Sequence, residues 1–100
     1  MIASATQYGS MVILRDQLGQ QVGSLSISNG QLLGFSRDFV VIQFGNMITT
    51  MDENQRTLGT IPLDSSFRVQ GINESGFSTR TGNMVFSYDK YCRQVGSYPV

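Results

Sequence analysis

The segment Gly82-Asn-Met-Val-Phe-Ser-Tyr-Asp89, followed by Val95-Gly-Ser-Tyr-Pro-Val100, decides the fold because the chain contains three versions of it. The earlier copies are Gly9-Ser-Met-Val-Ile-Leu-Arg-Asp16 with Val22-Gly-Ser-Leu-Ser-Ile27, and Gly45-Asn-Met-Ile-Thr-Thr-Met-Asp52 with Leu58-Gly-Thr-Ile-Pro-Leu63. Their spacings are 36 and 37 residues. Four positions are identical in every copy: Gly9/Gly45/Gly82, Met11/Met47/Met84, Asp16/Asp52/Asp89 and Gly23/Gly59/Gly96. A period of this length indicates a repeat architecture.

Each repeat predicts two β-hairpins. In the first copy, the first hairpin combines Met11–Leu14 with Gln21–Ile27, and polar turn residues separate these two β-prone runs. The second hairpin combines residues 31–35 with 39–44, and its equivalent in the next copy combines 67–72 with 76–81. Since no window has the apolar period of a helix, we expect an all-β chain in which each repeat is a four-stranded antiparallel meander.

The chain is out of phase with its repeat. Residues 3–8 align with 39–44, and residue 100 follows the first hairpin of the third copy. We expect the N- and C-terminal strands to complete the third unit together and to close a pseudo-threefold β-prism-like or propeller-like assembly. Completion of the repeats between several protomers is the alternative, and an ordinary barrel or sandwich is a third possibility.

Composition narrows the function classes. One hundred residues predict a single domain, 1–100. Only 14% of the residues are charged and the net charge is zero, which disfavours nucleic-acid binding. The chain has no apolar run long enough for a membrane span and no signal-peptide pattern at residues 1–7. We therefore expect a cytoplasmic protein with neither nucleic-acid nor membrane partners, although a mature secreted form stays open.

The invariant positions have structural interpretations. An Asp at the end of a strand accepts hydrogen bonds from its own turn, which explains the repeated Asp16 better than three carboxylate sites do. The Gly23 position predicts a bulge or a close approach of another sheet. The Met11 position predicts a ring of thioethers in a core layer near the pseudo-axis.

The residues suited to catalysis are few. The chain has no His, and its single Cys, Cys92, occupies a turn position that holds Gly19 and Gln55 in the other copies. Lys90 and Arg93 lie near Cys92 in sequence and would favour its thiolate, but the spacing of the carboxylates indicates neither acid–base catalysis nor a calcium loop. We expect a protein that is not an enzyme and that has no cofactor or metal.

Candidate binding residues come from polar repeat positions and from a tyrosine cluster. Arg56 and Arg93 are equivalent to each other, and so are Gln43 and Arg80. Tyr88 and Tyr91 lie near the third turn, and exposed tyrosines favour sugar stacking or protein interfaces. The candidate set is Tyr88, Tyr91, Arg93, Arg56, Gln43 and Arg80.

The hairpin from Gly82 to Ser97 resembles the repeated strand–turn–strand unit of the monocot mannose-binding lectins, and this resemblance implies a threefold β-prism. The sugar motif of that family, Q-x-D-x-N-x-V-x-Y, fails here: Gly45, Met47, Thr49 and Met51 follow Gln43 at the matching positions. The chain also lacks Trp. The resemblance therefore concerns architecture, and no functional residue carries over.

These observations favour a non-enzymatic β-repeat module that binds a protein partner or its own copies, so that a homo-oligomer is plausible. The alternative is a carbohydrate-binding, lectin-like module with up to three related sites. A small enzyme that uses its carboxylates or Cys92 is the third hypothesis.

Overall fold

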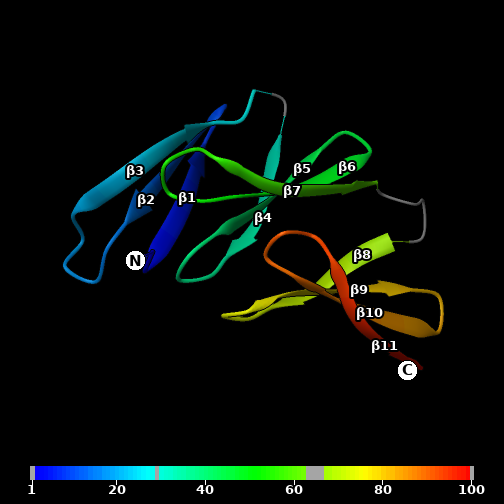
Figure 1. The fold of residues 1–100 in the computed structure, drawn as a ribbon. Coiled ribbons are helices and arrows are strands. Elements are labelled where there is room, and N and C mark those ends of the chain that lie inside the picture. Colours follow the sequence, from blue (N-terminus) through cyan, green and yellow to red (C-terminus); the bar gives the residue numbers. More distant parts are fainter. Residues whose placement is uncertain (1, 29, 63–66, 100) are drawn as a thin grey trace.

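The computed structural model describes residues 2–28, 30–62 and 67–99, which contain eleven strands, β1 to β11, joined by turns, and no helix (Figure 1). Leu63 and Val100, the last residues of two repeat copies, lie outside these ranges. The strands are β1 Ser4–Tyr8, β2 Met11–Arg15, β3 Gln21–Ser26, β4 Gln31–Phe35, β5 Val40–Phe44, β6 Met47–Met51, β7 Thr57–Pro62, β8 Phe67–Ile72, β9 Gly76–Thr81, β10 Met84–Asp89 and β11 Gln94–Pro99. The all-β prediction is confirmed. No helix in these ranges is long and apolar enough to cross a membrane.

The described strands form three antiparallel sheets, each in chain order: β1-β2-β3, β4-β5-β6-β7 and β8-β9-β10-β11. We call them the first, middle and last sheets. In each sheet a two-residue turn that begins with Gly9, Gly45 or Gly82 joins two strands, and each of these glycines has a positive φ. Such tight turns force the strands on either side of them to pair with each other.

The expected closure through the chain ends is wrong. β1 pairs with β2, whereas β10 and β11 pair with β9 and β8, so the two ends belong to different sheets. The physical reason is the tight turn at Gly9, Gly45 and Gly82, because it fuses the second hairpin of one repeat to the first hairpin of the next. The sheets are therefore shifted by half a repeat from the predicted units.

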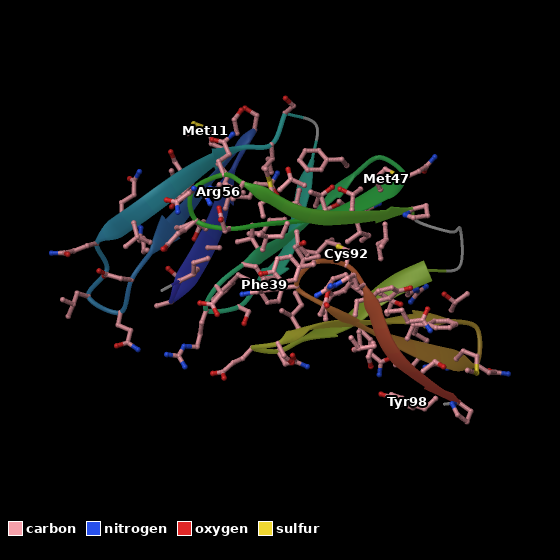
Figure 2. The ribbon with its side chains drawn as sticks, viewed as in Figure 1. Met11, Phe39, Met47, Arg56, Cys92 and Tyr98 are labelled. Carbon is pink, nitrogen blue, oxygen red and sulfur yellow. The ribbon has the colours of Figure 1, made fainter. Side chains whose placement is uncertain are left out.

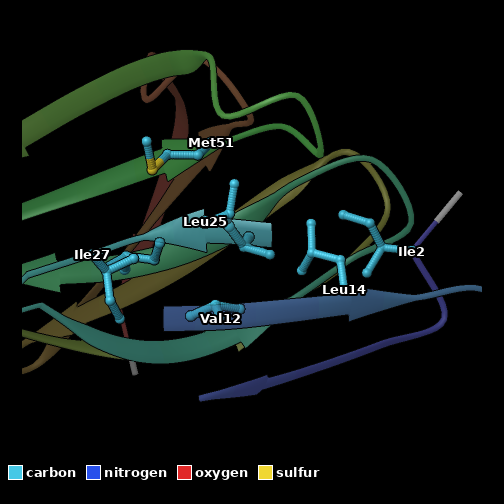
Figure 3. Packing of buried hydrophobic residues seen from close by; sticks show 8 residues of the cluster. Ile2, Val12, Leu14, Leu25, Ile27 and Met51 are labelled. Carbon is cyan, nitrogen blue, oxygen red and sulfur yellow. The ribbon is translucent and has the colours of Figure 1, made fainter. Parts of the chain in front are cut away.

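Two apolar clusters separate the sheets. The first contains Ile2, Val12, Leu14, Leu25, Ile27, Val40, Ile42 and Met51 (Figure 3). The second contains Phe39, Val41, Ile48, Phe77 and Cys92. Strand β5 contributes to both clusters, because Val40 and Ile42 face the first sheet while Val41 faces the last sheet. The middle sheet is therefore covered on both faces, and each of the other sheets is covered on one.

The predicted methionine ring is also wrong. Met11 is 42% exposed and Met47 is 38% exposed, and Figure 2 shows them well apart on different sheets. The reason is their position: each follows a two-residue turn directly and so lies at the rim of its sheet. The thioethers do not form a core layer.

The sheets approach one another along one side of the molecule. Strand β4 of the middle sheet contacts β1 of the first sheet and β8 of the last sheet. The later strands also lie close to the next sheet, because β3 approaches the β6–β7 turn and β7 approaches the β10–β11 turn. Figure 1 shows the middle sheet between the other two. We call this arrangement a fan of three sheets.

Candidate functional site

Asp16, Asp52 and Asp89 each organise the same turn. The Oδ1 atom of each Asp accepts hydrogen bonds of 2.9–3.0 Å from the backbone N–H groups two and four residues later. The residue three positions after each Asp has a positive φ, and these residues are Gly19, Gln55 and Cys92. The prediction that these carboxylates serve their own turns is confirmed. We call these segments the Asp turns.

The second invariant glycine explains how neighbouring sheets fit together. A Cβ atom on Gly23 of β3 would lie 2.5 Å from the carbonyl oxygen of Glu53, in the Asp turn of the middle sheet. A Cβ atom on Gly59 of β7 would overlap the carbonyl oxygen of Tyr91, in the Asp turn of the last sheet. The predicted close approach is confirmed at both glycines. We call each pairing of a glycine with the next Asp turn a sheet joint.

A buried hydrogen bond between Thr50 and Lys90 joins the two sheets at Gly59, and we call it the polar clasp. Thr50 lies opposite Gly59 in the β6–β7 ladder, and its buried hydroxyl donates a 2.6 Å hydrogen bond to the carbonyl oxygen of Lys90. The hydroxyl also lies 3.5 Å from Sγ of Cys92. At the joint of Gly23, Leu14 takes the position of Thr50 and packs in the first cluster. Each joint thus combines a main-chain approach with a buried side chain.

Cys92 belongs to the packing of this joint. Burial raises the pKa of its thiol, and the Asp89 carboxylate raises it further, whereas the hydrogen bond with Thr50 acts in the opposite direction. A buried thiol with a raised pKa is a poor nucleophile at neutral pH.

Gly96 in β11 is the third glycine of the series, and its joint is open. No described atom lies within 4 Å of the position that a Cβ atom would take. Val95 and Tyr98 beside it are 66% and 52% exposed. Ser87 lies opposite Gly96 in the ladder, where the middle sheet has Thr50 opposite Gly59. The last sheet therefore presents the glycine and hydroxyl half of a joint to solvent.

The Asp16 turn lies in the first sheet, at the other end of the molecule, and its residues 17–20 are exposed. Leu18 at its tip is 84% exposed. On the outward face of the first sheet, Tyr8 is 61% exposed. The alternation of β1 and β2 places Ile13 on this same face, because Val12 and Leu14 face the middle sheet.

Three of the six predicted site residues contact their own turn or the second cluster, and a fourth is exposed. Gln43 and Arg80 each donate a side-chain hydrogen bond to the glycine carbonyl of their own turn, at 3.2 and 3.1 Å. Tyr88 packs on the second cluster and stacks on Phe77 with ring centroids 5.3 Å apart. Arg56 is exposed in the Asp turn of the middle sheet (Figure 2).

The other two predicted residues, Tyr91 and Arg93, lie together. The Arg93 guanidinium lies 5.3 Å from the ring centroid of Tyr91, and Nζ of Lys90 lies 5.5 Å from it. Arg93 is also paired with Asp89 at 3.0 Å. Both residues are exposed in the last Asp turn.

The sequence does not predict the open joint at Gly96. The repeat identifies Gly96 as an invariant position, but it gives no reason to select Ser87, Val95 or Leu18. The available signal was the hydroxyl shared by Thr50 and Ser87 at equivalent positions. Nothing in the sequence pattern says which of the three glycines is uncovered, since that depends on sheet order.

The residues in ranges 2–28, 30–62 and 67–99 contain no group of three or more Cys, Asp or Glu side chains that could hold a metal ion. Comparison with protein families, with curated proteins and with solved structures finds no match to this chain.

Proposed function

We propose that this chain is a non-enzymatic β-repeat assembly module, which associates with further copies of itself through protein–protein contacts. The observation that carries this proposal is the open joint at Gly96. The chain already uses two such joints to hold its sheets together, and it exposes both halves of a third. Exposed apolar side chains rimmed by polar residues are typical of interaction surfaces.

The arrangement of the sheets supports a propeller-like assembly rather than a prism. Four-stranded antiparallel meanders whose first strands lie on a common side are the building units of β-propellers. The middle and last sheets are such meanders, and their first strands β4 and β8 approach each other. The first sheet has three strands, and its β1, which is equivalent to β5, also approaches β4. Three sheets would then form an arc of a ring, and assembly would complete it.

The chemistry of the turns supports a role without catalysis. The three repeated carboxylates accept hydrogen bonds from their own backbone, and Cys92 is buried with a raised pKa. Groups engaged in this way are poorly suited to proton transfer or nucleophilic attack.

Carbohydrate binding is the second candidate, and one observation favours it. The Tyr91 ring is exposed and carries two neighbouring cations, an arrangement suited to an acidic sugar. The equivalent residues are Leu18 and Asn54, so this arrangement exists once in the chain. We expect at most one sugar site, which NMR titration of the Tyr91 resonances with acidic and neutral glycans would detect.

The test of self-assembly is the mass in solution. Light scattering coupled to size-exclusion chromatography, across a concentration series, should give a mass that rises above the 11.0 kDa of one chain. A mass of one chain at every concentration would contradict the proposed function.

A further inference from the structure

We propose that two copies of the chain close a ring of six sheets, in which the Asp16 turn of each copy fills the open joint at Gly96 of the other. This inference rests on the proposed function and adds the contact surfaces and the number of copies. The occupant of the Gly96 joint is thus a second copy of this chain.

The first argument is continuity with the joints inside the chain. Gly23 receives the Asp turn of the middle sheet, and Gly59 receives that of the last sheet. The Asp16 turn has the same pair of backbone hydrogen bonds as the two turns that cover Gly23 and Gly59, so its main chain has the same shape. An acceptor and a matching turn therefore remain at opposite ends of the fan.

The second argument is the polar clasp. At the Gly59 joint the Thr50 hydroxyl donates to the carbonyl oxygen of Lys90, the residue that follows Asp89. At the Gly96 joint the equivalent hydroxyl belongs to Ser87, and the residue that follows Asp16 is Gln17. We assign to Ser87 of one copy a hydrogen bond to the carbonyl oxygen of Gln17 in the other.

The third argument is that each open face carries apolar or aromatic side chains among its polar ones. Val95 is equivalent to Leu58, which packs on the second cluster inside the chain. Tyr98 and Val95 on one face would meet Tyr8 and Ile13 on the other, and Figure 2 shows Tyr98 and Met11 at opposite ends of the molecule. Tyrosine and methionine are enriched in interface cores.

The polar residues on the outward face of the last sheet indicate a reversible complex. Arg80 and Ser87 accompany Val85 and Tyr98 on the outward face of the last sheet. At equivalent positions the middle sheet has Gln43, Thr50, Ile48 and Ile61, most of which are more apolar or more deeply buried. This composition fits chains that fold alone and associate reversibly.

The number of copies follows from the geometry of a head-to-tail contact. Such contacts give rings when the rotation closes and filaments when it does not. Two chains supply six sheets, four with four strands and two with three strands, and this number lies within the range of about four to eight blades in β-propellers, whereas three chains would exceed it. Closing the ring also makes the second joint intramolecular, which raises its effective concentration.

The experiment compares variants of the 100-residue chain by light scattering. We expect the wild type to form a discrete species of about twice 11.0 kDa. Gly96→Arg should raise the dissociation constant by about 100-fold or more, because the side chain fills the acceptor. Ser97→Arg adds the same side chain on the next residue, which faces the other way, and should change the dissociation constant by less than about threefold.

Mixing two defective chains keeps the test independent of folding defects. Asp16→Ala removes the acceptor that shapes the donor turn, and Asp38→Ala in another exposed position is its control. Gly96→Arg and Asp16→Ala should each be monomeric alone. A mixture should form a heterodimer through one intact joint, since one chain supplies a good turn and the other a good acceptor.

The outcomes separate the two proposals. A dimer that Gly96→Arg and Asp16→Ala leave unchanged would overturn the Gly96 joint while self-assembly stands. A mass that keeps growing with concentration would overturn the two-chain ring. A wild-type monomer throughout would overturn both proposals.

Discussion

Gly59 in β7 and Gly96 in β11 are the same residue of the repeat, yet they lie in opposite surroundings. The Asp turn of the last sheet covers Gly59, and Thr50 clasps that turn. Gly96 is open to solvent, and Ser87 is the residue opposite it. The comparison shows that a repeat position acquires its energetic importance from the neighbour that covers it, as expected for structures built from nearest-neighbour contacts.

The largest difference in the free energy of unfolding should appear when Gly59 and Gly96 are each replaced by Ala. Gly59→Ala forces a Cβ atom against the Tyr91 carbonyl oxygen and should lower the free energy of unfolding by about 1–3 kcal/mol. Gly96→Ala meets open space and should change it by less than about 0.5 kcal/mol. Urea unfolding at a concentration where both chains are monomeric measures these values, and equal losses would contradict the comparison.

Removing the hydroxyl groups of Thr50 and Ser87 should give the next largest difference in stability. Thr50→Val leaves the Lys90 carbonyl without its 2.6 Å donor and should cost about 1–2 kcal/mol. Thr50→Ser retains the hydroxyl and is the control for its loss. Ser87→Ala should change the stability of the monomer by less than about 0.5 kcal/mol. If Thr50→Val and Ser87→Ala have the same effect, the clasp contributes nothing.

The reactivity of the Cys92 thiol measures how tightly the joint at Gly59 is closed. Its thiol is buried beside Thr50 and Gly59, so the native chain should react with a thiol reagent about tenfold or more slowly than the unfolded chain. Gly59→Ala should accelerate the reaction because it loosens the joint, whereas Gly96→Ala should not. The absorbance of released thionitrobenzoate follows the reaction. Rapid native labelling of the wild type would show that the joint is open.

The smallest expected effect is the loss of stability in acid when the Asp89 carboxylate is protonated. The pKa of Asp89 is lowered chiefly because its carboxylate accepts the backbone hydrogen bond of Arg93, with further contributions from Tyr91 and the Arg93 side chain. The carboxylate therefore stabilises the fold above its unfolded pKa of 3.8, and this contribution disappears as the pH falls through the lower folded value. The melting temperatures of the wild type and Asp89→Asn should converge between about pH 5 and about pH 2. A constant difference would contradict the assignment.

The strands were largely predictable from the sequence. The runs 67–72 and 76–81 match β8 and β9, because β-branched and aromatic residues alternate with glycine and polar turn residues there. The Asp turns were predictable too, since an Asp side chain and its turn lie within five residues of each other and need no distant partner.

The grouping of strands into sheets was not predictable by the same means. Any two consecutive hairpins in this chain have compatible lengths and patterns, so the period alone leaves the phase of the sheet open. The tight turns at Gly9, Gly45 and Gly82 contained the decisive information. The sites of Gly96 and Met11 depend on that phase, and they could not be assigned without it.

The joints are made by main-chain carbonyl groups, and this leaves the tips of the Asp turns unconstrained in sequence. Leu18, Asn54 and Tyr91 occupy one equivalent tip position, all three are exposed, and each donates its backbone N–H to the Asp of its own turn. Evolution can therefore diversify these tips while Asp and Gly preserve the architecture. A combinatorial library at positions 54 and 91 would sample new recognition surfaces without disturbing the register of the sheets.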